Sequence, residues 1–156
     1  MLNFNVIIVT TDLSEYSLRA LPYAVGLAER FDAALKVVCV AEPAIQVSDV
    51  AFLGIDPVLS RRQHVEVVSD ALLKIVADLP DTVDIEAKVL DGYPVDQIVN
   101  YAKAINADLI VSCTHGRGGL VHALMGSTAE ALVRKSPCPV LTLKQPMMVA
   151  AVQHGG

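Results

Sequence analysis

Short apolar runs rich in β-branched residues alternate along this chain with longer segments whose apolar residues recur every three or four positions. Runs of the first kind predict buried strands, and segments of the second kind predict amphipathic helices. The predicted strands are residues 5–11, 35–40, 83–90, 108–112 and Val140–Leu143. The predicted helices are residues 13–31, 57–79, 94–105 and 126–135.

A strict alternation of strands and helices predicts parallel pairing through right-handed crossovers. The expected fold is therefore α/β, with a five-stranded open parallel sheet and helices on both of its faces. Hydrophobic residues make up 53% of the chain and aromatic residues 4%, so Val, Ile, Leu and Ala must build the interior. We expect one domain over residues 1–144 and a C-terminal tail over residues 145–156, because 156 residues fit one core.

Charge and cysteine content exclude several kinds of partner. The formal net charge is −5 and the sequence pI is about 5.2, with no basic cluster larger than a pair, so nucleic acid is not expected as a partner. No apolar stretch approaches the ~20 residues that cross a bilayer, so no membrane segment is expected. Three cysteines and no basic, apolar leader favour a reducing, cytoplasmic location.

Two loops are expected at the edge of the sheet where ligands bind in open parallel sheets, beyond the carboxyl ends of the strands. The first is residues 10–12, which contains Thr11 and Asp12, and the second is the glycine-rich loop 113–119. Residues Gly126, Ser127 and Thr128 follow at the start of the last helix, where backbone N–H groups lack intrahelical partners and favour an anion.

The glycines would allow positive φ angles and a close approach of the backbone to phosphate, and Arg117 would lie along a phosphate chain. The competing interpretation is a plain capping box, because Glu130 stands three residues after Ser127. The loop is not a Walker A motif, since no Gly-Lys-Ser/Thr follows it.

The segment from Cys113 through Thr114 and Gly116, followed after nine residues by Gly126-Ser127, resembles the G-x-x-G-x9-G-(S/T) nucleotide motif of universal stress proteins. The sequence from residue 114 to residue 141 is similar to that family almost without a gap, and so are residues 11–14 and 92–94. The likeness covers residues 4–144 and leaves residues 42–62 without motif support.

The resemblance implies a Rossmann-like sheet of the adenine nucleotide alpha-hydrolase type, with strand order 3-2-1-4-5 and a homodimer paired through the last strand. In one branch of the family it also implies bound ATP, with or without magnesium. By position, Asp12 and the Val40 backbone would meet the adenine and ribose. The residues that would line the site or hold the phosphates are Thr11, Cys113, Thr114, Gly116, Arg117, Gly119, Gly126, Ser127 and Thr128.

Two departures from the family pattern bear on binding. Cys113 stands where the motif has its first glycine. A cysteine there is strained if the position requires a positive φ, and it is tolerated if the position requires only a small side chain. The Pro that often precedes Thr-Asp in the family is Thr10. Cys113 also has two interpretations, a reactive thiol near a helix N-terminus or a packed, inert cysteine.

Three functions follow as hypotheses. The first is an ATP-binding stress-response protein that acts as a nucleotide-responsive binding module for a partner, with at most slow hydrolysis, since no general base is evident. The second is a dimeric interaction protein of the same fold that does not bind nucleotide. The third is an adenylyl-transfer enzyme, which residues 10–14 do not favour because they lack the motifs of such enzymes.

Overall fold

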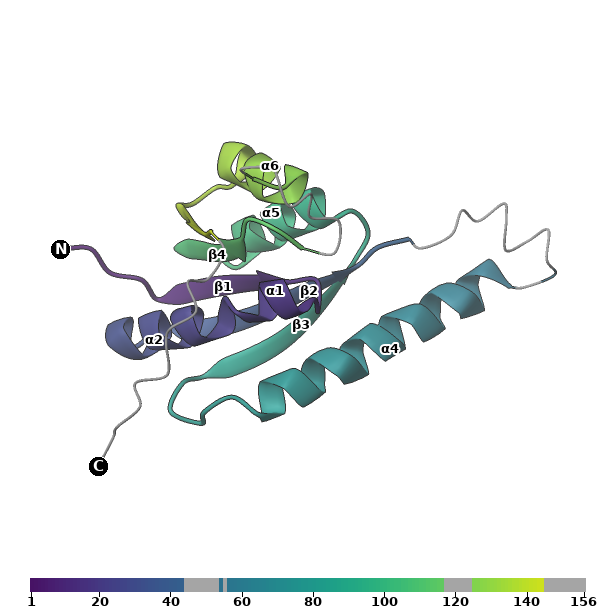
Figure 1. Ribbon diagram of the computed structural model, residues 1–156, viewed down its shortest axis with the longest axis horizontal. Coiled ribbons are helices and arrows are strands. Elements are labelled where there is room, and N and C mark those ends of the chain that lie inside the picture. Colours follow the sequence, from purple (N-terminus) through teal and green to yellow (C-terminus); the bar gives the residue numbers. More distant parts are fainter. Residues whose placement is uncertain (44–53, 55, 117–124, 145–156) are drawn as a thin grey trace, which may run out of the picture.

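The computed structural model of the protein describes residues 1–43, 54, 56–116 and 125–144 (Figure 1). Its strands are β1 (Val6–Thr11), β2 (Ala34–Ala41), β3 (Ile85–Asp91), β4 (Leu109–Cys113) and β5 (Val140–Leu143). Its helices are α1 (Glu15–Leu18), α2 (Leu21–Phe31), α4 (Pro57–Ala77), α5 (Pro94–Ala104) and α6 (Ser127–Lys135).

The five strands form one parallel sheet in the order β3-β2-β1-β4-β5, which confirms the predicted fold. Val9 in the central strand pairs with Val37 of β2 and Val111 of β4, and these three side chains are fully buried. Strands buried on both faces read as continuous apolar runs, which is why the sequence marks them so clearly.

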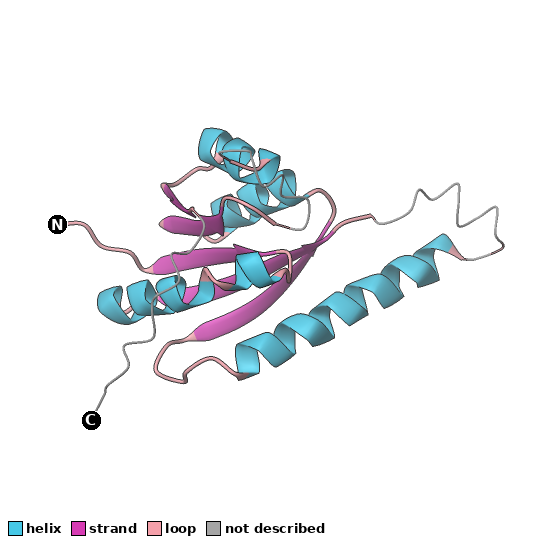
Figure 2. Ribbon diagram, viewed as in Figure 1, coloured by secondary structure: helices cyan, strands magenta, loops and turns pink. Residues whose placement is uncertain are grey.

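Helices cover both faces of the sheet (Figure 2). On one face, α2 and α4 pack over a cluster that includes Ile7, Leu35 and Leu72. On the other face, α5 and α6 pack over a cluster that includes Ile8 and Leu132. The alternation of side chains along each strand sends neighbouring residues to opposite clusters, so both faces of the sheet contribute to the core.

The prediction of one helix over residues 13–31 is wrong, because the chain forms α1 and then α2 with a break at Arg19 and Ala20. Pro22 lies in the first turn of α2 and has no N–H with which to bond the carbonyl of Leu18, so a continuous helix cannot pass through it. Ser14 is the N-cap of α1, and its side chain accepts a hydrogen bond from the N–H of Ser17.

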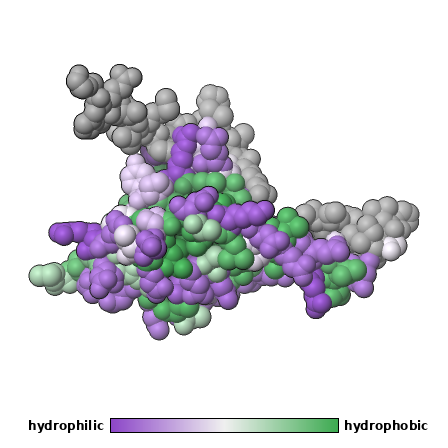
Figure 3. All heavy atoms as spheres, turned by 90° about the horizontal axis from the view of Figure 1, so that it is seen from below, coloured by the Kyte–Doolittle hydropathy of each residue, from purple (hydrophilic) through white to green (hydrophobic). Residues whose placement is uncertain are grey.

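Helix α4 is long, with 21 residues, and among them Leu72 is the one classed as fully buried. Arg61 holds its first half to the sheet, because the guanidinium donates to the Ala41 carbonyl at 2.8 Å and pairs with Asp91 at the end of β3. Figure 3 shows apolar atoms interspersed with hydrophilic ones on the face seen from below. Val58 and Leu59, at the start of α4, are among the exposed apolar residues.

Candidate functional site

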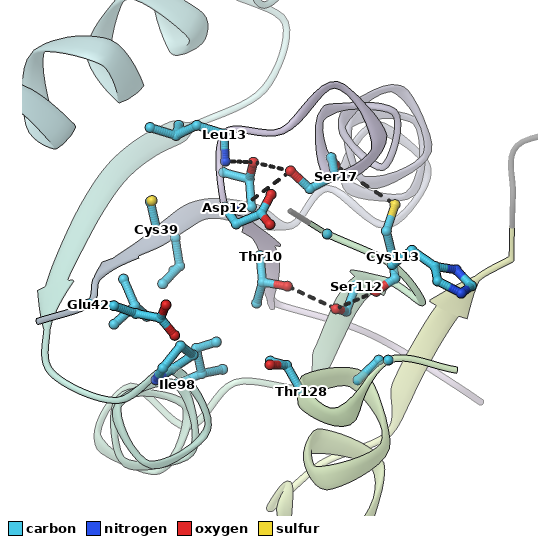
Figure 4. A pocket seen from close by; sticks show the side chains of 18 of the residues that line it. Thr10, Asp12, Leu13, Ser17, Cys39, Glu42, Ile98, Ser112, Cys113 and Thr128 are labelled. Carbon is cyan, nitrogen blue, oxygen red and sulfur yellow. Dashed lines mark hydrogen bonds between the residues drawn. The ribbon is translucent and has the colours of Figure 1, made fainter. Parts of the chain in front are cut away.

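A cavity of about 580 Å³ opens at the carboxyl ends of the strands (Figure 4). The ends of β1, β2 and β4 line it, together with the first turns of α5 and α6 and two residues of α4. This is the edge at which parallel sheets bind ligands, and the strand order reverses there between β1 and β4.

The turn after β1 places a carboxylate at the cavity. Asp12 Oδ1 accepts a hydrogen bond from the Ser14 N–H at 2.9 Å, and the Thr11 hydroxyl lies 2.7 Å from the Ser17 hydroxyl. Leu13 has a φ of 66°, an unusual conformation for a non-glycine residue, and its N–H donates to the Thr11 hydroxyl oxygen at 3.0 Å. Local hydrogen bonds therefore hold this turn and orient Asp12.

A side chain at Gly116 or Gly126 would force neighbouring atoms to move, the Asp12 carboxylate in the first case and backbone in the second. A Cβ at Gly116 would collide with Asp12 Oδ2, and a Cβ at Gly126 would lie 2.7 Å from the Thr114 carbonyl oxygen. Neither glycine has a positive φ, so neither uses the conformational freedom that glycine would allow. The Gly126 N–H donates to the Thr114 carbonyl at 2.6 Å, which joins the start of α6 to the residue after β4.

The start of α6 is not capped by a side chain of any residue that the structure describes. Gly126 is the N-cap, and within the described ranges no side chain accepts a hydrogen bond from the first turn. The capping-box interpretation is wrong, because Ser127 lies inside the helix and Glu130 bonds to Arg134 at 2.7 Å instead. Since Gly126, Ser127, Thr128 and Ala129 all line the cavity, the positive end of the helix dipole faces it.

Cys113 fits its position without backbone strain, because its φ is not positive. Its thiol donates to the Tyr16 carbonyl at 3.1 Å, so the side chain contacts α1. Burial raises the pKa of the Cys113 thiol, and the Asp12 carboxylate adds to that rise, while a hydrogen bond to the Ala20 backbone opposes it. The pKa shift is opposite to the one that a reactive-thiol interpretation requires.

The structure brings most of the predicted site residues to this one cavity. Those among its lining residues are Thr11, Asp12, Val40, Cys113, Thr114, Gly116, Gly126, Ser127 and Thr128. Arg117 and Gly119 lie outside the described residues, as does the tail 145–156. His115 also lines the cavity, and its Nδ1 lies 3.0 Å from the Thr114 hydroxyl, within hydrogen-bond distance.

Thr10, in the predicted loop 10–12, lines the cavity, whereas several other lining residues were not predicted: Glu42, His64, Ile98 and Ser112. For Ser112 a signal exists, because it is a polar residue near the end of a strand that is otherwise apolar. Glu42 follows β2 directly and is found by the same rule. His64 and Ile98 lie on helices, and their approach to the cavity depends on helix packing that the sequence pattern does not specify.

Negative side chains and backbone dipoles dominate the electrostatics of the cavity. Asp12 and Glu42 both line it, and no lysine or arginine does so among the residues that the structure describes. Within the same part of the chain, no cluster of three His, Cys, Asp or Glu side chains is arranged to hold a metal ion. None of the described helices is both long enough and apolar enough to cross a membrane.

The parallel order and helix layers are those of the adenine nucleotide alpha-hydrolase-like fold. The model of the universal stress protein family matches residues 3–144, and the chain belongs to that family. A universal stress protein of Methanocaldococcus jannaschii is 35% identical over 153 residues, which cover 92% of this chain and 84% of that protein.

Solved structures of universal stress proteins have a fold similar to that of this chain. A universal stress protein from Lactobacillus plantarum superposes with a TM-score of 0.70 at 22% identity, covering 92% of this chain and 99% of the other. A universal stress protein in complex with cAMP superposes with a TM-score of 0.61 at 27% identity, covering 91% and 98%.

Proposed function

We propose that the cavity binds an adenine nucleotide, with ATP as the expected ligand, and that the protein acts as a nucleotide-responsive binding module in a stress response. The observation that carries the proposal is the start of α6, whose first turn lines the cavity and is not capped by any side chain in the described part of the chain. Backbone N–H groups at such a position suit a phosphate. Family membership and the relative in complex with cAMP support an adenine nucleotide as the class of ligand.

The proposed arrangement places the phosphates at Gly116, Gly126, Ser127 and Thr128, with Arg117 and Gly119 contributing from the loop between them. The ribose lies at β1, on its side toward β4, and the adenine lies toward β2, so that Thr11, Asp12 and Val40 are near this end of the nucleotide. Cys113 and Thr114 form the wall at the end of β4. Magnesium, where present, is held by the phosphates and by Asp12, because it prefers one or two carboxylates together with phosphate oxygens.

The wider proposal includes a cytoplasmic homodimer. Strand β5 lies at one edge of the sheet, where backbone groups are available to a second copy. Leu141 on that strand and Val133 on α6 are 38% and 50% exposed. These features suit pairing through Val140–Leu143.

Hydrolysis of the bound nucleotide is expected to be slow at most.

Calorimetric titration of nucleotide-free protein with ATP and magnesium tests the proposal. We expect measurable binding, competition by ADP or AMP, and at least tenfold weaker binding by Gly126→Ala, whose Cβ would meet the Thr114 carbonyl. The matched control is Gly26→Ala, because Gly26 lies on α2 with nothing within 4 Å of an added Cβ. No heat with ATP, and no competition by ADP or AMP, would overturn the proposal.

A second candidate is the interaction protein that does not bind nucleotide. The two carboxylates at the cavity, Asp12 and Glu42, favour it because both oppose an anionic ligand. Under this alternative Cys113→Gly, which gives the chain the full family motif, creates binding that the natural protein lacks. Adenine nucleotide released from the purified natural protein on heating, detected by its absorbance near 260 nm, contradicts the alternative.

A further inference from the structure

Thr10 and Ser112 form a hydroxyl pair at the base of the cavity (Figure 4). They lie on the adjacent strands β1 and β4, and their oxygens are 3.0 Å apart. Both are buried, at 8% and 5% exposure. By alternation they share a sheet face with Ile8 and Ile110, which belong to the apolar cluster beneath α5 and α6. A buried polar pair on an apolar face is costly unless it is hydrogen-bonded, and the bond between the two hydroxyls meets this need without a ligand.

The direction of the hydrogen bonds decides what this pair offers to a ligand. The Thr10 hydroxyl donates to Ser112 Oγ, and the Ser112 hydroxyl donates to the Cys113 carbonyl at 3.3 Å. Each hydroxyl has one hydrogen and two lone pairs, so both hydrogens are used and lone pairs remain on both oxygens. Toward the cavity the pair therefore presents acceptors, which suit an O–H or N–H group of a ligand and repel an ionised phosphate.

The order of the elements indicates which part of a nucleotide lies over this pair. From α6 the sheet runs through β4 and β1 to β2, with adjacent strands about 4.8 Å apart. A phosphate at the start of α6 lies beside β4, because Gly126 bonds to Thr114. The next group of an adenine nucleotide is the ribose, which then lies over the boundary between β4 and β1. The base follows over β2, beside Val40.

We propose that Thr10 and Ser112 form a ribose subsite that accepts hydrogen bonds from the sugar hydroxyls and so selects ribonucleotides over deoxyribonucleotides. This inference rests on the proposed function, because it specifies how the same cavity recognises its ligand. At the phosphate end of the cavity, backbone N–H groups donate hydrogen bonds, and at the sugar end the two hydroxyl oxygens accept them. The two ends of the cavity therefore match the acceptor groups of the phosphates and the donor groups of the sugar.

The test measures the dissociation constants of ATP, 2′-deoxy-ATP and 3′-deoxy-ATP by calorimetry for the natural protein, Thr10→Val and Ser112→Ala. One neutral hydrogen bond corresponds to about a three- to tenfold change in affinity. We expect the natural protein to prefer ATP over at least one deoxy analogue by about that factor or more. Thr10→Val keeps the side-chain shape and is expected to reduce this preference about threefold or more, mainly by weakening ATP.

Two further variants act as controls. Thr10→Ser keeps the hydroxyl and is expected to keep the preference. Thr142→Val makes the same chemical change on β5, where Thr142 pairs with Ser112 but does not line the cavity, and it is expected to leave the preference unchanged. Melting curves establish that each variant is folded. If Thr10→Val does not fold, Ser112→Ala is used to measure the same ratio of affinities, ATP against the deoxy analogues.

The outcomes separate this inference from the proposed function. If the natural protein binds none of the three nucleotides, both are overturned. If it binds ATP and the deoxy analogues equally, or if Thr10→Val weakens all three by the same factor, the ribose subsite alone is overturned. If the effect of Thr10→Val requires magnesium, the pair accepts from water on the cation and the ribose assignment is wrong.

Discussion

Gly116 tests the shape of the cavity at the scale of a single residue. Because an added Cβ would collide with Asp12 Oδ2, Gly116→Ala must displace the carboxylate or the loop. Such overpacking costs about 1–3 kcal/mol, so we expect ATP affinity to fall about tenfold or more, measured by calorimetry.

The matched control for this variant is Gly26→Ala on α2. Nothing lies within 4 Å of its added Cβ, so this change is expected to stabilise the protein by about 0.5–1 kcal/mol and leave affinity unchanged. Unchanged affinity in Gly116→Ala would show that the carboxylate does not limit the site.

Cys113 is expected to react slowly at neutral pH. Its raised pKa lowers the thiolate fraction at pH 7, and the thiol is engaged with the Tyr16 carbonyl. Mass spectrometry after iodoacetamide treatment should show slower labelling than for the same cysteine in unfolded protein, with the rate rising above pH 9. Labelling at pH 7 as fast as in the unfolded chain would contradict this account.

Local sequence patterns indicated where the cavity lies better than they indicated the contacts within it. The spacing of Gly116 and Gly126 located the cavity, but the reason for each glycine is a contact made by Asp12 or Thr114 from elsewhere in the fold. The capping box failed because Glu130 has a second partner one helical turn on, Arg134, and the pattern does not rank the two bonds.

At the scale of the element, Asp56 is expected to stabilise the start of α4. Its carboxylate accepts from the N–H groups of Val58 and Leu59 at 2.9 and 3.4 Å. Loss of such a cap costs about 1 kcal/mol, so Asp56→Ala should lower the melting temperature by about 2–4 °C. Asp56→Asn keeps an acceptor and should melt near the natural protein. Equal losses in both variants would assign the effect to charge and not to capping.

The pair of Lys36 on β2 and Glu86 on β3 gives the sheet a small pH dependence. Their side chains meet at 2.6 Å, which lowers the pKa of Glu86 and raises that of Lys36. The depressed carboxyl pKa means that the stabilisation is present above about pH 4.3, the usual value for Glu, and is lost as pH falls through the folded value. The raised lysine pKa means that it is lost again at strongly alkaline pH, above about 10.4.

Glu86→Gln is the variant that measures this contribution. Glu86 is half exposed, so the loss at pH 7 should stay below about 1 kcal/mol and shrink in high salt. Urea unfolding at pH 7 and pH 3 checks this expectation, and the difference between natural protein and variant should vanish at pH 3. A difference that is the same at both pH values would contradict the ion-pair account.

The elements themselves were largely predictable from sequence, for physical reasons. Nearly continuous burial in β1 and β4 produces apolar runs, and helix period marks α4 and α5. The break between α1 and α2 was missed because the helical period continues through it, while Pro22 stops the hydrogen bonding. The period of apolar residues indicates which face of a helix is buried. It does not indicate whether the backbone hydrogen bonds of the helix continue without a break.

At the scale of the whole molecule, the alternation of strands and helices predicts a parallel sheet, and the family resemblance supplied the order of its strands. That order places β1 and β4 side by side. It also brings the Cys113 thiol to the carbonyl of Tyr16, which lies 97 residues earlier in the chain. The cavity therefore joins segments from both halves of the chain. Its occupant, partner and oligomeric state depend on contacts with other molecules, which explains why sequence pattern alone leaves them as hypotheses.

The central claim is that this cavity holds ATP with its phosphates at the start of α6. A crystal structure of the protein grown with saturating ATP and magnesium tests it most directly. The account predicts phosphate density within hydrogen-bond distance of the backbone N–H groups of residues 126–128, the ribose over Thr10 and Ser112, and the base beside Val40. An empty cavity at saturating ATP, or a nucleotide bound elsewhere on the molecule, would contradict it.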